Sequence, residues 1–231
     1  MPRSCIPLIA ALLASAAIPP MDAAAQAIPS SFTFIEKKQE AGLYAGVVTA
    51  EKGRFGFGPS GGTAFGGRYA VELTGPLALE GRLGFVSGTR DIVNPGRVLG
   101  DQVVGEGDVL LTEVDAHIRF SFVGDRAWRG LAPFLSFGGG IVFDAADAPI
   151  EEEDLEPADV FDFGTSFVGS TGLGTRWFLT ETLALRLDGS FSLWSIDTPP
   201  GFSNPDRGFE NVEESQWMSG LSFGVALLYR W

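Results

Sequence analysis

The sequence of 231 residues contains one cysteine, Cys5, and one histidine, His117. This scarcity excludes a disulfide framework and any metal site that needs several Cys or His ligands. The net charge of -13 excludes nucleic acid as a default partner. Beyond the N-terminal segment, no apolar run approaches the ~18 residues of a membrane-spanning helix. We therefore predict no metal, no cofactor and no transmembrane helix.

Glycine and phenylalanine are abundant, with 31 and 19 copies. Hydrophobic residues make up 45% and charged residues 19%, which excludes a disordered chain. Glycine disfavours helices, whereas aromatic side chains suit strands. The composition therefore favours an all-β fold.

The first residues have the pattern of a secretory signal peptide. Arg3 precedes an apolar run over residues 6–18, and Ala25-Gln26-Ala27 supplies the small residues that signal peptidase recognises. A membrane-spanning helix is the alternative, but the run is too short and contains prolines. We predict a signal peptide over residues 1–27, which removes Cys5 from the mature chain.

From about residue 41 onward, apolar side chains alternate with small or polar ones. The clearest segment runs from Trp217 to Trp231, where the odd positions are apolar except Ser219 and the even positions, from Met218 to Arg230, are mostly small. Successive side chains of a strand point to opposite faces, so one face of the sheet is apolar. Residues 41–50 form a plausible first strand of ambiguous phase. Further alternating segments are 63–73, 77–87, 109–123, 131–143, 161–178 and 183–195.

Three observations place the apolar face outside a barrel. The interior of an eight-stranded barrel barely holds its own side chains, so dozens of large apolar ones would overfill it. The opposite face is rich in Gly, Ala and Ser, which suits a narrow lumen. Connection lengths also alternate, as they do in outer-membrane barrels. The short turns are 74–76, 124–130 and 179–182, and the long connections are 51–62, 89–108, 144–162 and 196–214.

The alternating segments, the loop rhythm and the ending Val225–Trp231 resemble the eight-stranded outer-membrane β-barrel family, which includes the OmpA transmembrane domain and OmpX. The resemblance covers about residues 41–231. It implies an all-β, eight-stranded antiparallel up-and-down transmembrane β-barrel, monomeric and located in the bacterial outer membrane. Residues 28–40 are then a short periplasmic leader, and a ten-stranded barrel is the alternative if residues 31–35 also pair.

The same resemblance implies partners. Outer-membrane lipid and lipopolysaccharide would surround the barrel. The barrel-assembly machinery would recognise an assembly signal in the terminal strand, formed by Leu227, Tyr229 and Trp231.

Ten charged residues share the small-residue face and are predicted to form an ion-pair network in the lumen. Five are acids and five are arginines, so their charges cancel. Charges in a poorly hydrated lumen require partners, and the planar guanidinium of arginine pairs well with carboxylates. The layer expected to plug the barrel near the short turns is predicted from the residues closest to those turns, which are Glu72, Glu80, Arg119, Arg176 and Arg186. The ten charged residues are Arg68, Glu72, Glu80, Arg82, Glu113, Asp115, Arg119, Arg176, Arg186 and Asp188.

The function predicted from these features is structural or interactive: a porin-like barrel with a plugged polar lumen that displays acidic loops. A narrow channel for small or hydrophobic solutes is the first alternative. A lipid-modifying enzyme is less favoured, because His117, with Glu113, Asp115 and Ser121 on its face, points inward, so no catalytic residue is assigned. A soluble, lipocalin-like binder is the third alternative.

The long connections leave several motifs open. Residues 144–162 are rich in acids without a basic residue, but they lack the spacing of a calcium loop, so a solvated, mobile loop is expected. Phe55–Gly58, with Phe202 and Phe209, fits either loop hairpins or adhesive tips. Gly138–Gly140 indicates close packing or a bend in the barrel wall.

Overall fold

The computed structural model describes residues 30–231 except 99, 148, 150, 151 and 153. The predicted signal peptide therefore lies outside the described residues. The chain divides at residue 30, and the second unit, Ser31–Trp231, contains every strand. Among the described residues, no helix is both long enough and apolar enough to span a membrane.

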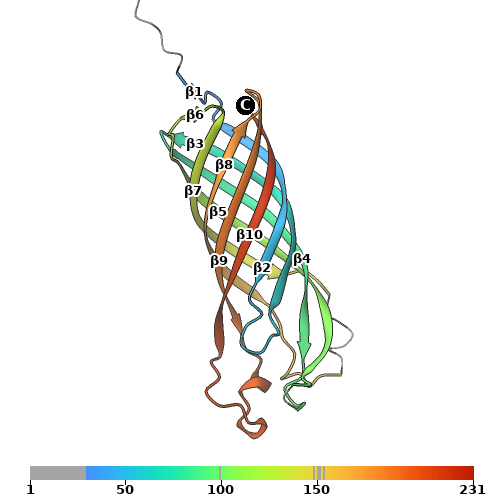
Figure 1. Ribbon diagram of the computed structural model, residues 1–231. Coiled ribbons are helices and arrows are strands. Elements are labelled where there is room, and N and C mark those ends of the chain that lie inside the picture. The colour runs from blue at the N-terminus through green and yellow to red at the C-terminus, as the bar shows by residue number, and fades with distance from the viewer. Residues whose placement is uncertain (1–29, 99, 148, 150–151, 153) are drawn as a thin grey trace, which may run out of the picture. The chain divides into compact units, whose positions relative to one another are not determined.

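Strands dominate the second unit (Figure 1). Two short 3-10 helices, η3 (Pro200–Ser203) and η4 (Pro205–Arg207), interrupt the last long connection. The strands are β1 (Phe32–Phe34), β2 (Gln39–Ala50), β3 (Pro59–Thr74), β4 (Leu77–Val93), β5 (Val103–Ser121), β6 (Arg126–Trp128), β7 (Leu131–Asp144), β8 (Thr165–Phe178), β9 (Leu183–Asp197) and β10 (Ser215–Arg230).

Eight of these strands close into an antiparallel barrel. The order is β2-β3-β4-β5-β7-β8-β9-β10, and β10 returns to β2 with Leu227 opposite Leu43. The up-and-down path leaves short turns at one end of the barrel and long loops at the other, as Figure 1 shows. We call these the short-turn end and the long-loop end. The predicted eight-stranded barrel is confirmed.

The two remaining strands lie outside the ring. β1 pairs with β6 in the connection that joins β5 to β7, with Phe32 opposite Trp128. Residues 31–35 do pair, but not as barrel strands, so the ten-stranded alternative is not realised. The segment predicted as a leader over 28–40 thus contains a strand, and β2 begins at Gln39, two residues before the expected boundary.

Apolar side chains face outward around the barrel. Leu221, Phe223 and Leu227 on β10 have exposed fractions of 48%, 63% and 55%. Their neighbours along the strand, such as Ala226 and Leu228, are buried inside. The period of two thus places a continuous apolar belt where lipid tails would contact it. Other members of the belt are Leu43, Phe65, Leu83, Ile118, Phe137, Leu173 and Leu187.

Several strands extend beyond the predicted segments at the long-loop end. β4 continues to Val93 and β5 begins at Val103, so their hairpin extends into the connection expected at 89–108. Outside the apolar belt both faces of this hairpin carry polar side chains, and the alternation fades. Backbone pairing needs no such alternation, which is why the sequence pattern stopped short of the strand ends.

Candidate functional site

Charged side chains occupy the lumen toward the short-turn end. Glu72 and Arg119 each lie two residues before the end of their strands at that end, and so does Arg176. Because strand side chains alternate, each points inward from a different wall. The resulting basal network comprises Glu40, Glu72, Glu80, Asp188, Arg68, Arg119, Arg176, Arg186 and Arg230.

Arg119 on β5 binds three carboxylates of the basal network. Its Nη1 donates to Glu40 Oε1 at 2.5 Å and to Glu80 Oε2 at 3.1 Å, and its Nη2 donates to Glu72 Oε1 at 2.9 Å. Only 1% of Arg119 is exposed. One guanidinium thus joins β5 to strands β2, β3 and β4 through three carboxylates.

The opposite wall supplies matching cations. Arg176 on β8 donates from Nη1 to Glu40 Oε2 at 3.0 Å and to Glu72 Oε1 at 2.6 Å. Arg186 on β9 donates from Nε to Asp188 Oδ1 at 2.9 Å and also binds Glu80. Except for the Arg186–Asp188 pair, which lies within β9, these bonds connect non-adjacent strands, so the network crosses the lumen instead of following one wall.

Aromatic rings supplement the carboxylates. The guanidinium of Arg186 lies 4.4 Å from the ring centroid of Phe134, and that of Arg119 lies 5.7 Å from the same ring. Arg68 lies 4.8 Å from the ring of Tyr44. A ring face attracts a desolvated cation, so these contacts stabilise guanidinium groups that water reaches poorly.

A second group, the His117 cluster, consists of Arg82, Glu113, Asp115 and His117. Arg82 Nη2 lies 3.0 Å from Glu113 Oε1 and 2.6 Å from Asp115 Oδ2. His117 Nδ1 lies 3.1 Å from Asp115 Oδ1, and Nε2 forms a 2.7 Å hydrogen bond with Ser170 Oγ. The structure thus places all ten charged residues predicted for the lumen in ion pairs, divided between the two groups.

Sequence analysis omitted two members of the basal network. Glu40 was assigned to the leader, although it shares the parity of the small residues Gly42 and Gly46 on β2. Arg230 fell on the small-residue face of the last segment but was not counted. Arg230 Nη2 donates to the Lys37 carbonyl at 2.8 Å, and its Nε lies 3.8 Å from Glu40 Oε2. With both included, six arginines still balance six carboxylates.

Ser170, His117 and Asp115 form a row with the residue types of a nucleophilic triad. Ser121, the serine noted from the sequence, takes no part in it. His117 reaches Ser170 across β7, where Gly138 lies between them in the strand register. A Cβ on Gly138 would lie 2.4 Å from His117 Cδ2, so the absence of a side chain there makes room for the ring. This supports close packing at the glycine run.

The row of Ser170, His117 and Asp115 lies outside the cavity in the lumen. The lumen cavity described below is lined by neither His117 nor Ser170. Asp115 also forms an ion pair with Arg82, so its carboxylate is shared between Arg82 and His117. Across the described residues, no group of three His, Cys, Asp or Glu side chains is placed to hold a metal ion.

The long-loop end is covered by an aromatic loop cap, which consists of Phe55, Phe57, Phe161, Phe202 and Phe209. The centroid of Phe57 lies 4.7 Å from that of Phe161 and 5.2 Å from that of Phe202. Phe57 and Phe202 are each 1% exposed. The phenylalanines that fitted hairpins or adhesive tips therefore pack together over the barrel mouth.

Ion pairs fasten the acidic connection 144–162 to this cap. Arg90 on β4 binds Glu152, and Arg207 on η4 donates to Asp159 at 2.5 Å and to Glu156 at 2.8 Å. The hydrogen bond that Arg207 donates to the Asp159 carboxylate raises the pKa of Arg207 above its usual value. Glu152 and Asp159 are buried, so the expectation of a fully solvated loop is wrong at these two residues. Their partners are distant in sequence, and the charge run gave no sign of them.

Comparisons with known proteins give structural matches only. No family model and no curated protein matches the chain. The outer membrane protein OprG from Pseudomonas aeruginosa superposes with a TM-score of 0.53 at 12% identity, covering 84% of this chain and 96% of that chain. Neisserial surface protein A superposes with a TM-score of 0.42 at 14% identity, covering 85% of this chain and 96% of that chain. The N-terminal β-barrel domain of Pseudomonas aeruginosa OprF superposes with a TM-score of 0.40 at 16% identity, covering 83% of this chain and 99% of that chain.

The match to OprG shows the fold, and the two lower scores add nothing to it. The fold is that of an eight-stranded outer-membrane β-barrel, as the resemblance in the sequence predicted. An apolar belt around such a barrel is stable only in contact with lipid. The protein therefore belongs in the bacterial outer membrane.

Proposed function

We propose that this protein is a non-catalytic structural and interaction barrel of the outer membrane, whose lumen is closed to solutes. The observation that carries the proposal is the basal network, which crosses the lumen from β2 and β3 to β8 and from β4 to β9. Every arginine in it has at least one carboxylate partner. A solute passing through the lumen would have to separate these pairs.

The cost of separating them supports closure. Removing one partner of a buried ion pair is strongly destabilising because an uncompensated charge remains. Arg119 and Arg176 are among the most deeply buried large side chains of the barrel. A transient opening would leave both guanidinium groups without carboxylates in a narrow, poorly hydrated space, so the closed arrangement is favoured.

The loop cap supports closure at the other end. Phe57, Phe161 and Phe202 pack with the inward side chains Val142 and Trp194 in one apolar cluster. The cap leaves several charged loop side chains exposed, including those of Asp101, Glu156 and Arg97. We propose that these loops form the surface that meets lipopolysaccharide or external partners, while the belt contacts lipid.

Single-channel recording in planar bilayers tests the closed lumen. We expect the parent protein to show no stable open state above background. The charge-neutral double variant Glu40→Ser/Arg176→Ser removes two long side chains that meet at 3.0 Å, and we expect it to conduct. The matched control Lys52→Ser/Asp91→Ser removes an ion pair outside the lumen and should behave like the parent. A stable open state in the parent would refute closure and favour a narrow channel for small or hydrophobic solutes.

A further inference from the structure

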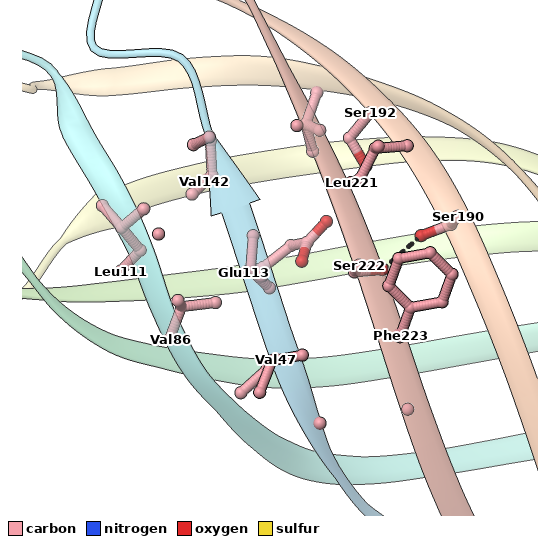
Figure 2. Close-up of a pocket in the computed structure, with 18 of the residues that line it drawn as sticks. Val47, Val86, Leu111, Glu113, Val142, Ser190, Ser192, Leu221, Ser222 and Phe223 are labelled. Carbon is pink, nitrogen blue, oxygen red and sulfur yellow. Dashed lines mark hydrogen bonds between the residues drawn. The ribbon is translucent and has the colours of Figure 1, made fainter.

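Between the basal network and the loop cap, the lumen contains a cavity of about 90 Å³. A buried water needs only roughly 10–15 Å³ on a comparable measure, so the space can hold a small organic molecule. Figure 2 shows Val86, Leu111 and Val142, from three strands, on one side of this space, with Glu113 nearby. Val47, Leu221 and Phe223, also in the figure, belong to the wall, and their side chains are exposed on the outer face.

Most of the inward side chains around the cavity are apolar. Ala64, Val142, Val168 and Trp194 are all buried, and Phe163 covers the side toward the loop cap. The hydroxyl groups of Ser190 and Ser222 form a hydrogen bond with each other at 2.6 Å, drawn as the dashed line in Figure 2. An apolar body therefore fits this space better than a strongly polar one.

The charged residues that line the cavity are already paired with one another. Arg68 binds Asp188 at 3.3 Å, and Arg82 binds Glu113 at 3.0 Å. An ionised molecule would enter without a free counter-charge and would lose its hydration. The cavity is therefore suited to an uncharged molecule.

Trp194 adds an uncharged hydrogen-bond donor that needs a partner. This side chain lines the cavity and is 7% exposed, and its Nε1 is buried without a hydrogen-bond partner among the described residues. Indole Nε1–H is a donor only. Buried polar groups are nearly always paired, because an unpaired donor loses its bond to water without replacement. The ligand that fits would carry a hydrogen-bond acceptor.

We propose that this cavity is a binding site for a small, uncharged, mainly hydrophobic molecule with one hydrogen-bond acceptor, such as an aryl ketone or ester. The acceptor oxygen takes the Nε1–H of Trp194. The hydrophobic body contacts Val86, Leu111 and Val142. Binding in this position requires no passage through the basal network, so the site is independent of whether the lumen conducts.

Acetophenone is a suitable probe because it has one acceptor, no donor and no charge. The protein, labelled with ¹⁵N at tryptophan and folded in lipid nanodiscs, gives separate indole N–H signals, and Trp194→Phe assigns the relevant one. We expect acetophenone to shift the Trp194 signal saturably. Trp217, which is 74% exposed on the outer face, reports probe dissolved in lipid and should shift without saturation.

Two further ligands test the stated chemistry. Ethylbenzene has a similar size but no acceptor, and we expect it to bind about fivefold more weakly, the effect of one hydrogen bond. Benzoate carries a charge and should not bind. Equal affinity for acetophenone and ethylbenzene would overturn the role of Trp194, and binding of benzoate would overturn the requirement for an uncharged ligand.

Variants locate the site. Ala64→Leu fills the cavity and should abolish the saturable shift, and Val86→Leu is a second filling variant if the first does not fold. Trp194→Phe keeps an apolar ring but removes the donor, so it should weaken acetophenone about fivefold, as measured by competition or calorimetry. Trp217→Phe is the matched control and should bind like the parent. Saturable binding that survives both filling variants, or the absence of saturable binding in the parent, would refute the site.

Discussion

Glu40 and Arg119 bind each other across the lumen, with Glu40 Oε1 and Arg119 Nη1 only 2.5 Å apart. They belong to β2 and β5, which are separated in the ring by β3 and β4. Both side chains are buried, and the second oxygen of Glu40 binds Arg176 on β8. A single carboxylate thus ties three parts of the wall together.

Replacing this carboxylate should destabilise the barrel strongly. Glu40→Gln leaves Glu72 as the carboxylate that Arg119 and Arg176 still share, and adds one uncompensated positive charge to the basal network. Breaking a buried pair in this way costs ~3–5 kcal/mol. We expect the barrel to unfold at a lower urea concentration. The midpoint is measured from the band of folded protein in detergent gels of unboiled samples. The control Glu36→Gln changes an exposed carboxylate just before β2 and should leave the midpoint unchanged. A midpoint equal to that of the parent would show that Glu40 is energetically dispensable.

The row of Ser170, His117 and Asp115 should have a structural and not a catalytic role. We expect purified protein in mixed micelles to release no fatty acid from phospholipid above the protein-free background. His117→Ala and Ser170→Ala should give the same result, because the lumen cavity does not reach these residues. Hydrolysis by the parent that either substitution abolishes would establish an enzyme instead.

Arg207 should protect the acidic connection from proteolysis. It holds Glu156 and Asp159 by ion pairs, and a guanidinium stays charged throughout the working pH range of proteases. We expect Arg207→Ala to speed cleavage of the Ala158–Asp159 bond, by an endopeptidase that cuts on the amino side of aspartate, several-fold, as followed by mass spectrometry. Arg97→Ala removes a long, exposed contact to Asp101 and serves as the control. Equal cleavage rates in parent and Arg207→Ala would mean that these ion pairs do not order the loop.

The terminal strand should matter for assembly more than for stability. Leu227, Tyr229 and Trp231 face outward, and Trp231 stacks with Tyr229 and lies near Tyr69. We propose that the barrel-assembly machinery recognises this row before β10 pairs with β2 and closes the ring. Deletion of Trp231 should slow machinery-dependent insertion several-fold, whereas spontaneous folding into pure lipid vesicles should change little. An equal loss in both assays would indicate a packing role only.

Local alternation explains why so much of the lumen was predictable. Whether Arg82, Glu113 or Asp188 faces inward depends only on the parity of its position relative to neighbouring apolar residues. The parity of positions did not predict the inward face of one strand, β2. Residues 41–50 carry Ala and Val on both faces, so their phase stayed ambiguous, and Glu40 was assigned to a leader instead of the lumen.

The sequence by itself determined the strand phase, the outward apolar belt and the set of charges that needed partners, because each depends on residues one or two positions apart. The tertiary structure decided which charges meet. Glu40 finds Arg176 at a separation of 136 residues, and His117 finds Ser170 at a separation of 53. It also decided that the loop phenylalanines form a cap and that Trp194 faces a cavity, since barrel closure alone brings those segments together.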